Sequence, residues 1–283
     1  TARVALVGDQ VRDHLVRTGI VSATRAATVI NGIPVERFGS SPVRRQAARA
    51  LFPSVIYQPV AGEFPAGSAS MPWSDDSRVT GEFARWQAGR VPQRAVTSAK
   101  SWLIHPGVDR QAPILPWGAP ADVPRLSPVE AQAELLRHVA QAWNRAHPAH
   151  PLAQQDVVLT IPASFDEAAR ALTLQAARDA GFELQRLTLL EEPQAAFYDF
   201  TSRHRDTLAK ALHGVRLVLV VDVGGGTTDF SLVQVAMLPE GPALQRLAVG
   251  EHLLLGGDNM DLALARQLER NLFPDGRTFS AAQ

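Results

Sequence analysis

The 283-residue sequence contains no cysteine, which excludes disulfide bonds, thiolate metal ligands and cysteine nucleophiles. Lysine is almost absent: of the 28 basic residues only Lys100 and Lys210 are lysine, so each is worth testing as a functional residue. Net charge is also lacking, because 28 acidic residues balance the 28 basic ones. Without a basic excess to match phosphates, we expect no nucleic-acid partner.

Long apolar runs are lacking too. No uncharged apolar stretch reaches the length of about 18 residues that a membrane helix needs, so we expect no membrane contact. Residues 1–8 show no basic segment followed by an apolar run, so no signal peptide is evident. Together with the missing cysteine, these absences favour a cytoplasmic protein. The length allows one large domain or two ordinary ones.

The first part of the chain changes character near residue 39. Residues 1–38 predict β structure, because short apolar runs alternate with turn signals such as Asn31-Gly32. Residues 39–126 are dense in proline and glycine and carry four of the five tryptophans. This stretch predicts a loop-rich insertion with one or two short helices.

Clear helix and strand signals follow. Ser127 and Glu130 form a capping box, which predicts a helix to about His147. The apolar run at 157–161 predicts a strand buried on both faces. A second capping box at 164–167 predicts a helix that begins there and ends at Gly181.

The same order then repeats. A strand at 184–190 precedes a helix opening at 191–193, so two strand-helix units in succession predict a parallel pair of strands. Three further strands are expected at 215–221, 230–238 and 244–249, followed by a helix capped by Asp258. The fold class is therefore α/β, with a first lobe over 1–212 and the start of a second over 213–283.

Residues 222–229 (DVGGGTTD) are the most informative segment. Three glycines in succession cost backbone entropy and are more than a hairpin needs, but they let N–H groups converge on an anion. Asp222 and Asp229 beside an anion are explained if Mg²⁺ lies between them. A hairpin tip without a ligand is the alternative. No Gly-Lys-Ser/Thr follows, so the segment is not a P-loop.

Four segments together resemble a known family. Residues 157–165 (VVLTIPASF), 190–196 (LEEPQAA), 221–229 (VDVGGGTTD) and 255–258 (LGGD) are similar, in order and spacing, to the ATPase domain of DnaK-type heat-shock chaperones. The resemblance covers about residues 79–268. It implies the actin-like (RNase H-like) fold, in which two lobes with mixed sheets flanked by helices face a nucleotide cleft. It also implies ATP or ADP and Mg²⁺ as cofactors, with unfolded polypeptides and co-chaperones as partners of parts outside this chain.

The resemblance assigns roles to matching residues. Asp222 would hold the water shell of Mg²⁺, with Asp229 nearby, and Glu192 would lie near the metal and the attacking water. Lys100, in a segment similar to the one that carries the family's catalytic lysine, would stabilise the transferred phosphoryl group. The residues implied to bind nucleotide are Gly224, Gly225, Gly226, Thr227, Thr228, Gly256 and Gly257.

Pro162 and Arg170 match the family's proline switch and its relay arginine. Taken alone, Pro162 could simply end a strand, and Arg170 could be an exposed helix residue. Lys100 taken alone would be a solvated surface residue.

Two departures from the family pattern bear on activity. The opening Gly-x-Asp-x-Gly-Thr-Thr turn of the family is not found between the first strands. If Gly8-Asp9-Gln10 is a degenerate relic of that turn, the resemblance implies that Asp9 replaces the metal-organising aspartate. The second lobe has three strands and one helix, so we expect it to be incomplete. Slow or impaired ATP hydrolysis is therefore expected.

Three functions remain open at this point. The first is the ATP-binding domain of a DnaK-like chaperone, which residues 190–196 and the Pro162–Arg170 pair favour. The second is a small-molecule kinase of the same superfamily, for which no separate general base is evident. The third is a non-hydrolysing scaffold, which the missing first turn favours.

Overall fold

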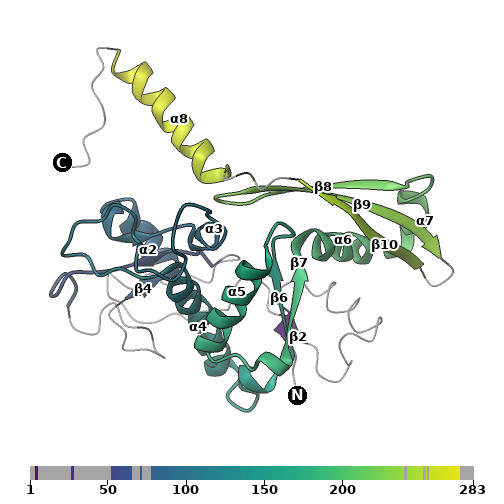
Figure 1. Cartoon of the computed structure of the whole chain (residues 1–283), viewed down its shortest axis with the longest axis horizontal. Helices are drawn as coiled ribbons and strands as arrows, with labels where there is room; N and C mark the ends of the chain where they lie inside the picture. The colour runs from purple at the N-terminus through teal and green to yellow at the C-terminus, as the bar shows by residue number, and fades with distance from the viewer. Residues whose placement is uncertain are drawn as a thin grey trace. The chain divides into compact units, whose positions relative to one another are not determined.

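The computed structural model describes residues 4–5, 27–28, 52–65, 71, 78–238, 241–250, 253 and 255–274 (Figure 1). The chain divides into two compact units. Unit 1 comprises Thr1–Ile161 and Phe165–Ala211, and unit 2 comprises Pro162–Ser164 and Leu212–Gln283.

Unit 1 contains a four-stranded sheet. Its order is β2 (Ala27–Thr28), β1 (Val4–Ala5), β6 (Val157–Ile161) and β7 (Leu187–Glu191), and all neighbours are parallel. Four of the five residues of β6 are buried, which confirms the strand that the apolar run predicted. β7 begins at Leu187 rather than at residue 184, because residues 184–186 form a 3₁₀ turn. The rest of 1–38, including Asp9, lies outside the described residues.

Four helices accompany this sheet: α4 (Pro128–Ala146), α5 (Glu167–Asp179), α6 (Glu192–Arg203) and the short α7 (Leu208–Ala211). The predicted capping box of α4 is confirmed. The hydroxyl of Ser127 accepts from the N–H of Glu130 at 3.1 Å, and the Glu130 carboxylate accepts from the N–H of Ser127 at 2.7 Å. Both bonds satisfy N–H groups that a helix start otherwise leaves unpaired.

The predicted cap of α5 is wrong by two residues. Asp166, not Ser164, is the N-cap, and its carboxylate accepts from the N–H of Ala169 at 2.6 Å. This hydrogen bond is the largest contribution to the lowering of the pKa of Asp166. Ser164 does not cap the helix because its hydroxyl instead donates to the carboxylate of Asp229 at 2.8 Å. Four 3₁₀ turns complete the description: η2 (Pro92–Arg94), η3 (Leu152–Gln154), η4 (Leu184–Arg186) and η5 (Arg205–Thr207).

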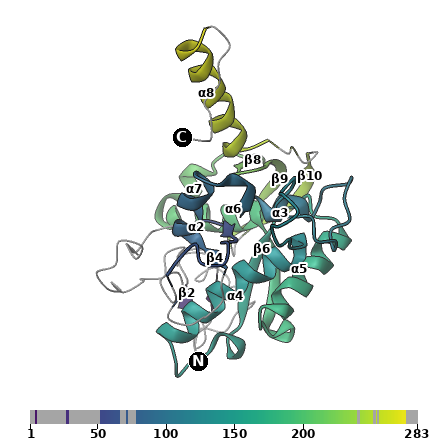
Figure 2. The ribbon, with the colours of Figure 1, turned by 90° about the vertical axis from the view of Figure 1, so that its left-hand side faces the viewer.

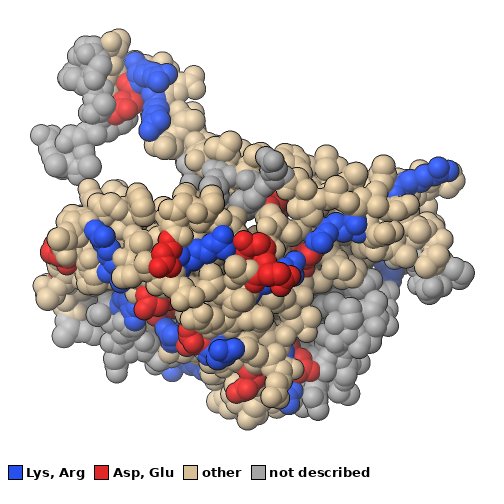
Figure 3. All heavy atoms as spheres, in the orientation of Figure 1, with Lys and Arg blue, Asp and Glu red and all other residues tan. Residues whose placement is uncertain are grey.

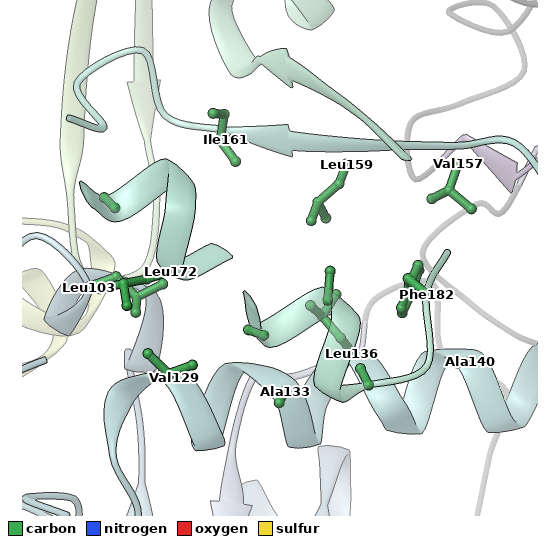
Figure 4. Packing of buried hydrophobic residues seen from close by; sticks show 14 of the residues in the cluster. Leu103, Val129, Ala133, Leu136, Ala140, Val157, Leu159, Ile161, Leu172 and Phe182 are labelled. Atoms are coloured by element: carbon green, nitrogen blue, oxygen red, sulfur yellow. The ribbon is translucent and has the colours of Figure 1, made fainter. Parts of the chain in front are cut away.

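The main core of unit 1 lies between β6 and two helices that run side by side, α4 and α5 (Figures 1 and 2). Val157, Leu159 and Ile161 point from β6 into the cluster that these helices complete (Figure 4). Burial of each large aliphatic side chain stabilises the fold by about 1.5–3 kcal/mol relative to exposure. This core holds the ends of β6 and β7, where several predicted site residues lie.

The proline-rich stretch contains more regular structure than the sequence predicted. The expectation of one or two short helices is confirmed, because the described part of this stretch contains α2 (Gly81–Ala88) and α3 (Ala99–Trp102). A three-stranded antiparallel sheet was missed, with order β4 (Val79–Thr80), β3 (Ile56–Tyr57), β5 (Ala95–Val96). Each strand has two residues, too short to show an alternating pattern.

Unit 2 contains an antiparallel sheet and one helix. The sheet order is β10 (Gly241–Val249), β9 (Thr228–Leu238), β8 (Leu217–Val223), and α8 (Gly257–Leu272) follows. The cap expected at Asp258 is wrong: α8 begins after Gly256, whose N–H donates to the side-chain oxygen of Asn259 at 2.9 Å. One face of β8 is apolar and 49–59% exposed, through Leu217, Leu219, Val221 and Val223.

Acidic and basic side chains of the described residues are interspersed on the face shown in Figure 3. Several pair with each other in unit 1, among them Arg94 with Asp122 at 2.6 Å and Arg186 with Asp156 at 2.9 Å. Among the described residues, no helix has the length and apolarity to cross a membrane.

Candidate functional site

The glycine-rich segment forms the turn between β8 and β9, as the sequence predicted. The N–H of Gly224 donates to the carbonyl of Thr227 at 2.8 Å and closes the turn. Val223 then lies opposite Thr228, and Asp222 lies opposite Asp229 in the antiparallel ladder. The two aspartates therefore extend from the same face of the hairpin, next to the turn.

The second glycine pair packs directly against this turn. The N–H of Gly257 donates to the carbonyl of Gly224 at 2.9 Å, and the hydroxyl of Thr228 donates to the carbonyl of Leu255 at 2.7 Å. A Cβ atom at Gly256 would lie 2.5 Å from the carbonyl oxygen of Gly225, so no side chain fits there. We refer to residues 224–227 together with Gly256 and Gly257 as the glycine cradle.

The glycine cradle offers unused hydrogen-bond donors. No described residue accepts from the N–H groups of Gly225 and Gly226 or from the hydroxyl of Thr227, and all three residues are exposed or half-buried. The N-terminus of the 16-residue helix α8 adjoins them, and helix N-termini favour anions. A phosphate group would fit these three donors and the adjoining helix N-terminus. In contrast, the N–H of Gly224 donates within the turn, to Thr227, and Thr228, which follows the turn, donates to the carbonyls of Leu253 and Leu255.

The two aspartates could hold a cation beside such a phosphate. Asp229 is 6% exposed and accepts the hydrogen bond from Ser164, whereas Asp222 is half-buried. Mg²⁺ in proteins takes one or two carboxylates together with waters and phosphate oxygens, which fits this pair. In the part of the chain that the structure describes, no three His, Asp or Glu side chains cluster as a metal site.

Ser164 contacts a candidate site residue, Asp229, and sequence reasoning missed this contact. Its hydroxyl binds a buried carboxylate, which is costly to bury without such a donor. The signal available in the sequence was a polar residue three positions after the end of β6. The spacing of residues 164–167 instead suggested that Ser164 caps a helix.

In unit 1 the structure brings Lys100 and Glu192 together, although they are 92 residues apart. The ammonium group of Lys100, on α3, donates to the carboxylate of Glu192, the first residue of α6. Their side chains are 44% and 20% exposed. A carboxylate at a helix N-terminus is favoured by the helix dipole. The arrangement fixes a cation that can neutralise developing negative charge.

Arg170 contacts the last residue of β7, which directly precedes Glu192. Its guanidinium donates to the carboxylate of Glu191 at 2.7 Å and to the carbonyl of Phe165 at 3.3 Å. Glu191 was not singled out in the sequence. Pro162 directly follows β6, is buried, and belongs to unit 2, whereas Arg170 belongs to unit 1. Their predicted role as a switch stays a prediction.

Comparison with known proteins finds sequence similarity over most of this chain. The family model described as Hsp70 protein matches residues 69–274. The chaperone protein HscA homolog of Acinetobacter baumannii (strain AYE) is 28% identical over 271 residues, which is 92% of this chain and 38% of that protein. The homolog of Histophilus somni (strain 2336) is 32% identical over 249 residues, 81% of this chain and 34% of its own length.

A third HscA homolog, from Actinobacillus pleuropneumoniae serotype 5b (strain L20), is 33% identical over 229 residues, with 77% of this chain and 32% of that protein covered. The chain thus spans about a third of the length of the curated relatives it matches. The family model covers more than half of the chain and includes all four segments that carried the resemblance. The chain belongs to the Hsp70 family of ATP-binding, actin-like chaperone ATPases.

Proposed function

We propose that this chain is the ATP-binding region of an HscA-like chaperone, with the glycine cradle as its phosphate site. The observation that carries the proposal is the contact between two glycine segments, at 224–227 and 256–257, which leaves two amides and one hydroxyl without an acceptor among the described residues. Such convergent donors are typical of anion sites. Membership of the Hsp70 family supports nucleotide as the anion.

Each predicted site residue that the structure describes has a place in this proposal. The donors of Gly225, Gly226 and Thr227 bind phosphate oxygens, while Gly224, Thr228, Gly256 and Gly257 keep the cradle in shape. Asp222 and Asp229 would hold Mg²⁺, and that ion would neutralise phosphate charge.

In unit 1, Lys100 stabilises the transferred phosphoryl group, and Glu192 fixes the ammonium of Lys100 and orients the attacking water. Pro162 and Arg170 act as the switch that the resemblance implies.

We propose the actin-like architecture for this chain, with one lobe over residues 1–212 and a second over 213–283. The division into compact units between Ala211 and Leu212 supports these boundaries. Hydrolysis is proposed to be slow, because the Gly-Thr-Thr turn of the first lobe is missing from residues 1–38. Loss of one set of preorganised donors costs about 10²–10³ in rate. Unfolded polypeptides and co-chaperones are proposed as partners of segments beyond this chain, in the cytoplasm.

Calorimetric titration of the full chain with ATP and ADP, with and without Mg²⁺, tests the proposal. We expect binding that Mg²⁺ strengthens and that Gly256→Ala weakens at least tenfold. Gly89→Ala is the matched control, since the nearest atom to its Cβ is an ordinary 3.5 Å away. Absence of binding at millimolar nucleotide would refute the proposal in favour of the scaffold. A single-turnover rate typical of complete Hsp70 proteins would refute the slow hydrolysis.

A further inference from the structure

The hydroxyl of Ser164 donates directly to the buried carboxylate of Asp229. The oxygen that accepts is Oδ1, at 2.8 Å, and both residues belong to unit 2 although they are 65 residues apart in the chain. Asp229 is 6% exposed, whereas Ser164 is half-buried. A buried carboxylate is costly without polar partners, and a hydrogen bond to a charged group is stronger than one between neutral groups. The contact is therefore strong enough to influence where the carboxylate lies.

Ser164 itself lies in a stretch of backbone with little freedom. It follows Pro162 and Ala163, which are both buried, and precedes Phe165, which is 5% exposed. The ring of a proline locks its own φ, and close-packed neighbours leave the backbone little room to shift. The hydroxyl of Ser164 therefore approaches Asp229 from a defined direction.

The orientation of Asp229 matters because a second carboxylate faces it. Asp222 lies directly opposite in the ladder of β8 and β9, so the two Cβ atoms are about 4.5–5.5 Å apart. Like charges at this spacing repel, and the last torsion of an aspartate side chain is broad, so a carboxylate turns easily. The bond to Oδ1 opposes that rotation. Since a carboxylate has two oxygens and about four lone-pair sites, it can accept from a hydroxyl and bind a cation together.

We propose that Ser164 is a positioning residue of the cation site, which holds the carboxylate of Asp229 so that it binds one divalent cation together with Asp222. The inference rests on the cation site of the proposed function, but it does not require ATP. Groups that hydrogen-bond to metal-binding side chains fix the orientation of those side chains, and their removal typically lowers metal affinity about 10–100-fold.

Titration of the full chain with Mn²⁺, followed by the relaxation of water protons, measures this site with and without ADP. Ser164→Ala should weaken Mn²⁺ binding about tenfold, whereas Ser164→Thr, which keeps a hydroxyl, should stay within about twofold of wild type. A general loss of packing would not be rescued by the hydroxyl of threonine. Unchanged or tighter Mn²⁺ binding in Ser164→Ala overturns the proposal, and so does a Ser164→Thr variant as weak as Ser164→Ala.

Ser231→Ala is the matched control. Ser231 lies two residues after Asp229 on the same buried face of β9 and is 2% exposed. Among the described residues its hydroxyl has no hydrogen-bond partner. Its removal deletes a buried hydroxyl from the same strand without removing a bond to Asp229, so the affinity for Mn²⁺ should not change.

Hydrogen exchange without metal or nucleotide tests the contact itself. Peptides from β9 should exchange about tenfold faster in Ser164→Ala, because the loss of a hydrogen bond to a charged group has at least this effect on an equilibrium. In an Asp229→Asn background the same substitution should have a smaller effect, since a neutral amide binds a hydroxyl more weakly than a carboxylate does. Equal effects in both backgrounds would show that Ser164 does not act through Asp229, which overturns the proposal.

Failure of the proposed function has a different signature. If the chain binds Mn²⁺ with the expected dependence on Ser164 but binds neither ATP nor ADP in calorimetry, the proposed function is wrong and the role of Ser164 stands. If nucleotide binds but the wild-type chain takes up no Mn²⁺, with or without ADP, the role of Ser164 is wrong and the glycine cradle stands as the phosphate site.

Discussion

The contact of Gly256 with the β8–β9 turn allows a sharp prediction for Gly256→Ala. The backbone of Gly256 (φ −152°, ψ −162°) is open to alanine, so torsional strain is not the obstacle. The added Cβ would instead lie 2.5 Å from the carbonyl oxygen of Gly225, 2.6 Å from that of Gly224 and 2.6 Å from the nitrogen of Thr227. All three are backbone atoms, which cannot rotate aside as a side chain does.

Relief of this overlap requires the turn and the start of α8 to separate by about 1 Å, the gap between these approaches and ordinary contact. That movement weakens two hydrogen bonds, from Gly257 to Gly224 and from Thr228 to Leu255. Each is worth about 0.5–1.5 kcal/mol, and overpacking adds about 1–3 kcal/mol. We therefore expect Gly256→Ala to destabilise the cradle by about 2–5 kcal/mol.

Hydrogen exchange read by mass spectrometry measures this locally, without assuming that both units unfold together. Peptides spanning 222–230 and 253–262 should exchange at least tenfold faster in Gly256→Ala. Gly257→Ala is the neighbouring control, because its Cβ would come no nearer than 3.7 Å to the β8–β9 turn and alanine suits a helix. Equal exchange in the two variants would refute the packing argument.

Three further predictions concern single side chains. Asp222→Asn removes the charge facing Asp229, so it should stabilise unit 2 by about 0.2–1 kcal/mol without Mg²⁺. The same change should abolish stabilisation by Mg²⁺, and calorimetric scans with and without the ion check both effects. Burial lowers the pKa of His138 from 6.5 to about 4, so unit 1 should lose up to about 3 kcal/mol as the pH falls from 6.5 to 4. His138→Phe should flatten that loss in circular dichroism titrations. Ser127→Ala should destabilise α4 by about 1 kcal/mol in urea unfolding, and an unchanged midpoint would contradict the capping role.

Local patterns predicted the parts of the fold that local chemistry decides. The buried strand β6, the capping box of Ser127 and the turn at 224–227 all follow from short-range signals that the structure confirms. The sheet of β3, β4 and β5 was missed because two-residue strands carry no periodicity, and tertiary pairing alone defines them.

The caps were misassigned where a distant contact overrode the local pattern. Ser164 fits a capping box by spacing, but the buried carboxylate of Asp229 takes its hydroxyl. Gly256 starts α8 because of its approach to the turn, which lies about thirty residues earlier in the chain. For the same reason the sequence cannot tell which of two adjacent glutamates binds Lys100, since only the tertiary structure brings Lys100 to Glu192 and Arg170 to Glu191.

The exposed apolar face of β8 has a practical consequence for work with this chain in solution. Within the described residues β8 is bonded on one side only, to β9, and four of its side chains are 49–59% exposed. An apolar strand at a sheet edge is a template for pairing with other molecules. We therefore expect this face of β8 to promote association of the chain in solution. Light scattering should show association that grows with concentration, and a lysine introduced at position 219 should suppress it.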